Sequence, residues 1–162
     1  MSEAFIIDAC RTPRGIGKYG KGALTHMHPQ MLGASVLRAL VDRNHIATEQ
    51  VDDIIWGTSS QVNEQKGDLG RMSALTAGFD QRASGVTLDR FCGSGITSVN
   101  FAAATIKSGM EDLVIAGGTE MMSMPGRGGA GPALMDRGNL ALRATHPQSH
   151  QGVCADAIAT IE

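Results

Sequence analysis

The residue best placed to do chemistry in this sequence is Cys92, in the run Arg90-Phe-Cys-Gly-Ser-Gly95. A cysteine thiolate is a nucleophile that can take an acyl group as a covalent thioester. The small residues after Cys92 let the backbone turn sharply and let a substrate carbonyl approach the sulfur. This pattern is typical of a nucleophile carried on a turn between a strand and a helix.

A helix is predicted directly after this turn, over residues 96–107, because the stretch is rich in alanine. The N-terminus of a helix offers unpaired N–H groups and a partial positive charge. Both favour the thiolate, which is the reactive form of cysteine. The same N–H groups can stabilise the oxyanion of an attacked thioester.

From the residues alone, Cys92 can equally be an inert core cysteine, because free cysteine usually packs as a small hydrophobic residue. The Gly-x-Cys-x-Gly pattern is also incomplete, since Arg90 stands where the first glycine would lie. Arg90 is not expected to activate the thiol, because it shares a face with Cys92 only if the strand continues undistorted. The residues therefore leave both interpretations of Cys92 open.

The composition is that of a globular protein and excludes several functional classes. The net charge is −2 and no stripe of Lys or Arg forms, so no nucleic acid is expected as a partner. The apolar runs are too short to span a membrane, and the N-terminus lacks a targeting pattern, so a cytoplasmic location is expected. Three cysteines far apart argue against a disulfide framework or a structural zinc site, and no metal site is predicted.

Strands and helices alternate along the first two thirds of the chain. Periodicity and turn residues predict strands at 5–9, 53–58, 85–90 and 113–117, and helices at 29–42, 69–77 and 96–107. This order, βαβαβαβ, indicates an α/β fold with helices on the faces of a parallel or mixed sheet. The first strand is expected to be buried.

The character of the chain changes after the last of these strands. Residues 123–150 are rich in Gly, Met and Pro without a clear period, which predicts a functional loop or an excursion from the core. Residues 151–162 are helical again. No Gly, Asn or Pro closes this helix, so we expect the sequence to be cut inside an element.

Four stretches of the chain together resemble the thiolase family, in its acetyl-CoA acetyltransferase group. They are Asp8-Ala-Cys-Arg-Thr-Pro-Arg-Gly15, Cys92-Gly-Ser-Gly-Ile96, Ala116-Gly-Gly-Thr-Glu-Met-Met-Ser-Met124 and Gln151-Gly-Val-Cys-Ala-Asp156. The resemblance implies a thiolase-like N-terminal half with a mixed sheet. Residues 1–122 would be its core domain, and residues 123–162 the beginning of a loop domain.

The resemblance also implies an activity, that of an acyl-CoA C-acyltransferase of lipid metabolism. Cys92 would carry the acyl group between acyl-CoA or 3-ketoacyl-CoA and CoA by ping-pong catalysis. His150 and Gln151 would approach the acyl and pantetheine part of the substrate. CoA thioesters would be substrates, with no separate cofactor, and the whole enzyme would be a homodimer or homotetramer.

Relatives in this family are much longer, and their second half supplies a Gly-His-Pro motif and a Cys-x-Gly motif. Neither motif occurs in these 162 residues. We therefore expect an N-terminal fragment that cannot turn over alone. Two alternatives stay open, a ketoacyl-synthase-like condensing enzyme and a non-catalytic fragment that acts only in subunit association. A redox-sensing role for Cys92 is weaker, since no resolving thiol lies nearby.

Two features of the Gly-Gly-Thr-Glu segment have a structural explanation. Glu120 can be a base, but a buried carboxylate that accepts backbone N–H bonds is the favoured interpretation. Met121, Met122 and Met124 are expected to pack in the core or between subunits rather than to bind metal.

Overall fold

The computed structural model describes residues 3–124 and 134–162, which belong to two compact units, Met1–Met124 and Pro125–Glu162. In the first unit, the described residues 3–124 form three α-helices, three strands and two short 3-10 helices. In chain order these are α1 (Pro29–Asn44), η1 (Thr48–Gln50), β1 (Asp53–Gly57), η2 (Asn63–Gln65), α2 (Leu69–Ala77), β2 (Val86–Leu88), α3 (Ser94–Ser108) and β3 (Val114–Gly118).

The three strands form one sheet in the order β2-β1-β3, and both pairings are parallel. The predicted α/β class is therefore confirmed. In a parallel sheet the carboxyl ends of all strands lie along one edge, where α/β proteins commonly bind ligands. Ser59, Cys92 and Glu120 lie in the segments that follow β1, β2 and β3 respectively. These three segments therefore begin at the same edge of the sheet.

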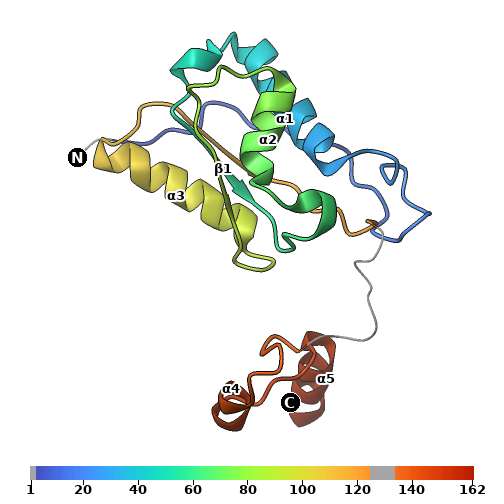
Figure 1. The fold of residues 1–162 in the computed structure, drawn as a ribbon. Coiled ribbons are helices and arrows are strands. Elements are labelled where there is room, and N and C mark those ends of the chain that lie inside the picture. Colours follow the sequence, from blue (N-terminus) through green and yellow to red (C-terminus); the bar gives the residue numbers. More distant parts are fainter. Residues whose placement is uncertain (1–2, 125–133) are drawn as a thin grey trace. The chain divides into compact units, whose positions relative to one another are not determined.

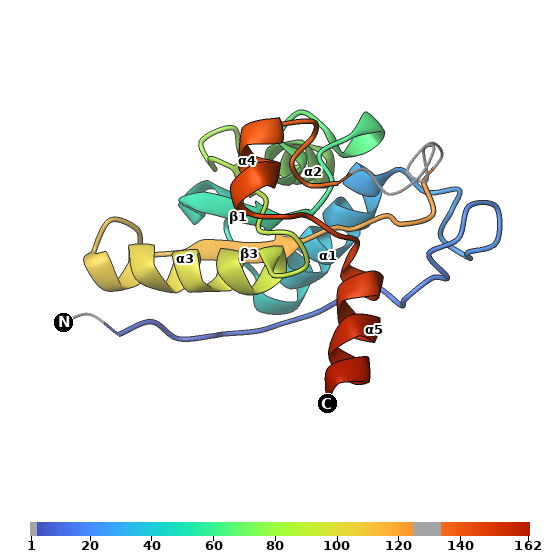
Figure 2. The ribbon, with the colours of Figure 1, turned by 90° about the horizontal axis from the view of Figure 1, so that it is seen from below.

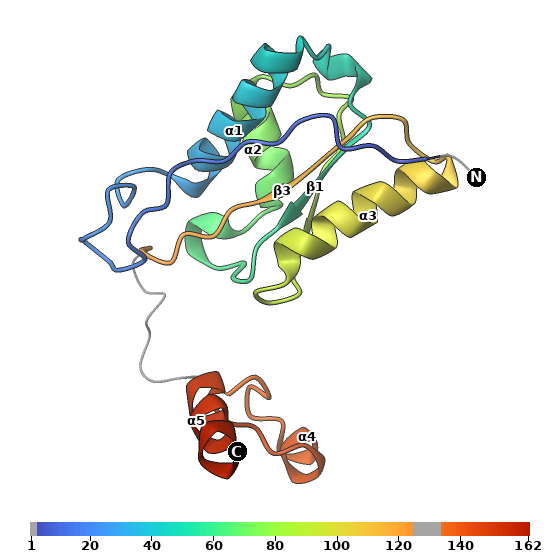
Figure 3. The same ribbon diagram turned by 180° about the vertical axis from the view of Figure 1, so that it is seen from behind.

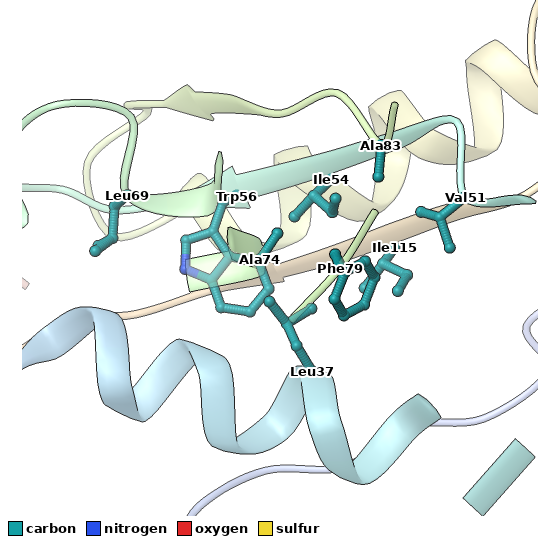
Figure 4. Close-up of a cluster of buried hydrophobic side chains, with 9 residues drawn as sticks. All are labelled: Leu37, Val51, Ile54, Trp56, Leu69, Ala74, Phe79, Ala83 and Ile115. Carbon is teal, nitrogen blue, oxygen red and sulfur yellow. The ribbon is translucent and has the colours of Figure 1, made fainter. Parts of the chain in front are cut away.

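Helices cover both faces of the sheet: α1 and α2 lie on one face and α3 on the other (Figure 1). Side chains alternate between the faces of a strand. Ile54 and Trp56 of β1 accordingly point into the cluster with α1 and α2 (Figure 4). Trp56 is 2% exposed, and its indole N–H donates to Thr119 Oγ1 at 3.0 Å. Nine residues make up this core: Leu37, Val51, Ile54, Trp56, Leu69, Ala74, Phe79, Ala83 and Ile115.

Local signals explain where the helices begin and end. The His28 side chain accepts the N–H of Gln30 before α1, and the Asp68 side chain accepts the N–H of Arg71 at the start of α2. Gly78 and Gly109 end α2 and α3 with φ of 90° and 79°, a left-handed conformation that costs glycine little. Helix α2 covers the residues predicted for it, because both of its end signals are strong.

The prediction of a buried first strand at residues 5–9 is wrong for this structure. Phe5, Ile6 and Ile7 are 78%, 81% and 75% exposed, and the segment runs extended outside the sheet (Figure 2). Asp8 holds it instead, accepting hydrogen bonds from Arg43 at 2.9 Å and Asn44 at 2.7 Å at the end of α1. An apolar run becomes a strand only beside another strand, and none of the described strands pairs with it.

Residues 134–162, the described part of the second unit, contain two helices, α4 (Leu140–Thr145) and α5 (Gln151–Ile161). Helix α4 lies within residues predicted to be a loop, since six residues are too few to show a helical period. The carboxylate of Asp136 accepts two hydrogen bonds of 2.7 Å from the Arg143 guanidinium, which ties the preceding turn to α4. The predicted loop also includes residues 125–133, which lie outside the described residues.

Acid is expected to loosen the turn before α4. The Arg143 guanidinium, together with the N–H of Gly138, lowers the pKa of Asp136 to about 2. A carboxyl with a depressed pKa stabilises the fold above its unfolded value of about 3.9 and loses this effect as it is protonated. The protection of the Gly138 amide against hydrogen exchange, relative to its intrinsic rate at each pH, should therefore fall as the pH drops from about 4 to about 2. Asp136→Asn should remove this acid transition, and a transition that persisted in the variant would contradict the assignment.

Candidate active site

Cys92 lies in the turn between β2 and α3, and its side chain is exposed. Figure 3 shows from behind the loop that leads into α3. The residue before it, Phe91, has a φ of 48°, which places a non-glycine residue in the left-handed region. Such a conformation is uncommon and marks a sharp turn. The strand therefore reverses into the helix within a few residues, with the Cys92 thiol at the surface.

Hydrogen bonds from two side chains hold this turn. The Ser94 hydroxyl accepts the N–H of Arg90 at 2.8 Å and donates to the carbonyl of Phe91 at 2.6 Å. The Asp89 carboxylate accepts the N–H of Phe91 at 2.7 Å. Sequence reasoning assigned no role to Ser94 or Asp89. The signal was present, because Asp and Ser commonly bond to backbone groups a few residues away in turns.

The start of α3 also leaves backbone donors in the residues that follow Cys92. The N–H of Gly93 donates to Arg90 and the N–H of Ser94 donates to Phe91, both within the turn. Among the described residues no acceptor is found for the N–H groups of Gly95 and Ile96, as expected for the first turn of a helix. Donors of this kind can stabilise negative charge on a carbonyl oxygen held near Cys92.

The first turn of α3 rests on the ends of two strands. A Cβ built on Gly57, the last residue of β1, would lie 2.7 Å from the carbonyl carbon of Ser94 and 2.9 Å from the N of Gly95. On β3, the carbonyl of Gly117 accepts the Ser98 hydroxyl at 2.9 Å. The position of the Cys92 turn is therefore set by close backbone contact with the sheet.

Within residues 3–124 and 134–162 no hydrogen bond joins a charged side chain to the sulfur of Cys92. The Arg90 guanidinium lies over the Phe101 ring, 5.9 Å from its centroid, so this residue packs along α3. The sheet carboxyls with shifted pKa lie at the opposite edge. The N–H groups of Leu113 and Asp112 lower the pKa of Asp52, whereas burial raises that of Asp53. No group of three possible metal ligands occurs among residues 3–124 and 134–162.

Glu120 follows β3 and is exposed, so the prediction of a buried carboxylate is wrong in that respect. Its predicted role as an acceptor of a backbone N–H is confirmed, since Oε2 accepts the N–H of Ser59 at 2.6 Å. Met121 and Met124 are buried as expected, and Met122 is 63% exposed. Glu120 therefore links the segment after β3 to the segment after β1.

A cavity of about 380 Å³ lies between the segment after Ala9, helix α1 and β3. Its lining includes Cys10, Val36 and Trp56 but not Cys92. Cys10 is half-buried and its thiol donates to the carbonyl of Val36 at 3.4 Å, as a packing cysteine does. The cavity and the candidate nucleophile are therefore separate features.

The other two predicted site residues, His150 and Gln151, belong to the second unit. His150 caps α5, where its Nδ1 accepts the N–H of Gly152 at 3.2 Å. Gln151 is the first residue of that helix, and both side chains are exposed. The structure thus assigns His150 a local role in starting α5, and their contact with substrate stays a prediction.

Fold and site define an α/β protein with a cysteine on a strand-to-helix turn at the carboxyl edge of a parallel sheet. The family model described as the thiolase N-terminal domain matches residues 4–159, and the chain belongs to the thiolase family.

Curated relatives agree over most of the chain. The chain is 48% identical over 124 residues to a 3-oxoadipyl-CoA/3-oxo-5,6-dehydrosuberyl-CoA thiolase of Escherichia coli, which covers 76% of the chain and 30% of the relative. It is 45% identical over 123 residues to a steroid 3-ketoacyl-CoA thiolase of Mycobacterium tuberculosis, a match that covers 76% of the chain and 30% of the relative. A 3-ketoacyl-CoA thiolase of Shewanella loihica is 38% identical over 75% of the chain and 31% of its own length. The chain thus matches about a third of the length of these relatives. Among the described residues no helix is long and apolar enough to cross a membrane.

Proposed function

We propose that this chain carries the nucleophile of an acyl-CoA C-acyltransferase. The Sγ of Cys92 attacks the thioester carbonyl of an acyl-CoA, and the bond from that carbon to the CoA sulfur breaks. CoA leaves with the electron pair and takes up a proton, while the acyl group stays on Cys92 as a thioester. The observation that carries the proposal is the exposed Cys92 directly before the first turn of α3, whose backbone N–H groups could stabilise an oxyanion.

The nature of the substrate is supported by the relatives, whose names specify thiolases acting on 3-oxoadipyl-CoA and 3-ketoacyl-CoA. We extend CoA thioesters to this chain as substrates, with CoA as the second partner and no separate cofactor. In the same proposal His150 and Gln151 approach the acyl and pantetheine end, and residues 123–162 begin a loop domain. The whole enzyme would act as a dimer or tetramer in cytoplasmic lipid metabolism.

The proposal separates into two half-reactions that can be tested apart. The 162 residues contain no Gly-His-Pro and no Cys-x-Gly motif, so this chain should accept an acyl group without completing the turnover. Incubation with acetyl-CoA at alkaline pH should add one acetyl group to Cys92, detected by mass spectrometry of the peptides. Acetoacetyl-CoA should not accumulate. The absence of any acyl group on Cys92 would contradict the proposed acyl transfer. Steady formation of acetoacetyl-CoA would contradict the expectation that this chain does not complete the turnover.

A role in subunit association is the second candidate, favoured by exposed apolar side chains on the first unit. Phe5, Ile6 and Ile7 are exposed, and so are Ile96 (72%) and Phe101 (47%) on α3. Large exposed apolar groups mark surfaces that another chain covers. Size-exclusion chromatography separates the candidates, because association alone predicts self-assembly without acetyl on Cys92.

A further inference from the structure

Glu120 joins two segments that leave the sheet beside the Cys92 turn. Its Oε2 accepts both the backbone N–H and the hydroxyl of Ser59, each at 2.6 Å. Its Oε1 accepts the side-chain N–H of Gln65 at 3.2 Å. Hydrogen bonds to a carboxylate are roughly twice as strong as neutral ones. The segment after β3 is therefore bound firmly to the segment after β1.

Gln65 completes the connection from a fully buried position, with 0% of its surface exposed. Its Nε2 donates to the carbonyl of Ser60 at 2.7 Å as well as to Glu120, and its Oε1 accepts the N–H of Met121 at 2.6 Å. A buried amide with partners on both sides holds them in one arrangement, because breaking either bond leaves a buried polar group unsatisfied. We call Gln65 and Glu120 together the clamp.

The segment that the clamp holds is the support of the Cys92 turn. Thr58 donates its N–H to the carbonyl of Leu88, the last residue of β2, at 3.1 Å. The neighbouring Gly57 has no room for a side chain against Ser94 and Gly95 at the start of α3. A shift of the segment after β1 would therefore move the helix start and the thiol that precedes it.

From these contacts we propose that Gln65 and Glu120 are positioning residues for the Cys92 nucleophile. The inference rests on the proposed acyl transfer to Cys92 and adds the groups that hold its geometry. The clamp touches neither the thiol nor, in this proposal, the substrate. It acts by fixing the position of the Cys92 sulfur relative to the N–H groups of the first turn of α3. Those N–H groups matter for acyl transfer, which passes through an oxyanion, and not for simple alkylation of the thiol.

The test compares two reactions of the same sulfur in Glu120→Gln. This variant replaces one carboxylate oxygen with an amide donor, which then faces the donors of Ser59 or Gln65. A misplacement of about 1 Å can cost a factor of about 100 in rate. We expect acetylation of Cys92 by acetyl-CoA to slow by about tenfold, while its alkylation by iodoacetamide changes by less than about twofold. Both rates are measured by mass spectrometry of the Cys92 peptide in the full chain.

Glu64→Gln is the matched control, because this substitution also removes one negative charge. Glu64 is the exposed neighbour of Gln65 in η2. Glu64→Gln should leave both rates unchanged. Ser59→Ala, which removes the hydroxyl but keeps the backbone N–H, should give a smaller fall in acetylation than Glu120→Gln. Trp56 fluorescence reports whether the core stays folded, because this tryptophan is buried and bonds to Thr119 beside Glu120.

The outcomes separate this inference from the proposed function. Acetylation of the unaltered chain with an unchanged rate in Glu120→Gln would overturn the clamp alone. An equal fall in acetylation and alkylation would also overturn it, because that is the result of general disorder of the turn. No acetylation of Cys92 in the unaltered chain would overturn the proposed function and the clamp with it.

Discussion

Replacing Cys92 with alanine should abolish the transfer of an acetyl group from acetyl-CoA to this chain, with a fall of at least about 1000-fold. The reason is chemical, because covalent catalysis requires the sulfur that forms the new bond. Cys92 is exposed at the start of α3, where backbone N–H groups and the helix dipole favour negative charge. Intact-mass and peptide mass spectrometry over a time course measure the effect.

Cys154→Ala is the matched control for this experiment. Cys154 is also exposed and lies in the first turn of α5, so it shares accessibility and a helix start with Cys92. It lacks the left-handed residue and the bracing by Ser94 that form the Cys92 turn. The control should keep the acetylation rate of the unaltered chain. Equal labelling of Cys92 and Cys154 would show that exposure alone explains the reaction and would contradict the special role of the turn.

Replacing Gly57 with alanine should lower the free energy of unfolding by about 1–3 kcal/mol, the usual cost of overpacking. The added methyl group would lie 2.7 Å from the carbonyl carbon of Ser94. That contact is with backbone, which cannot rotate away, so α3 would have to move off the sheet. Urea denaturation followed by the fluorescence of Trp56, the single tryptophan, measures the change.

Gly95→Ala provides the comparison within the same pair of elements. A Cβ built on Gly95 meets nothing within 4 Å, and Gly95 lies inside α3. Alanine there should stabilise the chain by about 0.5–1 kcal/mol, because glycine loses more backbone entropy in a helix. Equal effects of the two substitutions would show that close packing of Gly57 under the Cys92 turn is not what requires glycine there.

Elements with strong local signals could be predicted from the sequence. Helix α2 was predicted at Leu69–Ala77 with Gly78 ending it, and the structure adds the side chain of Asp68 as the cap at its start. The Cys92 turn was predicted because three small residues follow Cys92 between a predicted strand and a predicted helix. Helix α4 was missed because it is only six residues long. An element was predicted where residues close together in the sequence mark its start and its end, and it was missed where they do not.

Contacts between distant segments could not be predicted in the same way. Residues 5–9 have the composition of a strand, but strand formation depends on a partner that the local sequence does not specify. The hydrogen bonds of Glu120 with Ser59 and Gln65 join residues more than fifty positions apart. The exposure of Glu120 likewise depends on how these distant segments pack. No periodicity reports such a pair.

The sequence by itself therefore determined the α/β class, the family resemblance and Cys92 as the candidate nucleophile, because these depend on residue types at short spacing. Only the tertiary structure decided what supports the thiol. It showed Gly57 packed under the start of α3, Ser94 bracing the turn, and Gln65 with Glu120 holding the segment beside it. These are contacts through space, made only when the parallel strands bring their carboxyl ends to one edge.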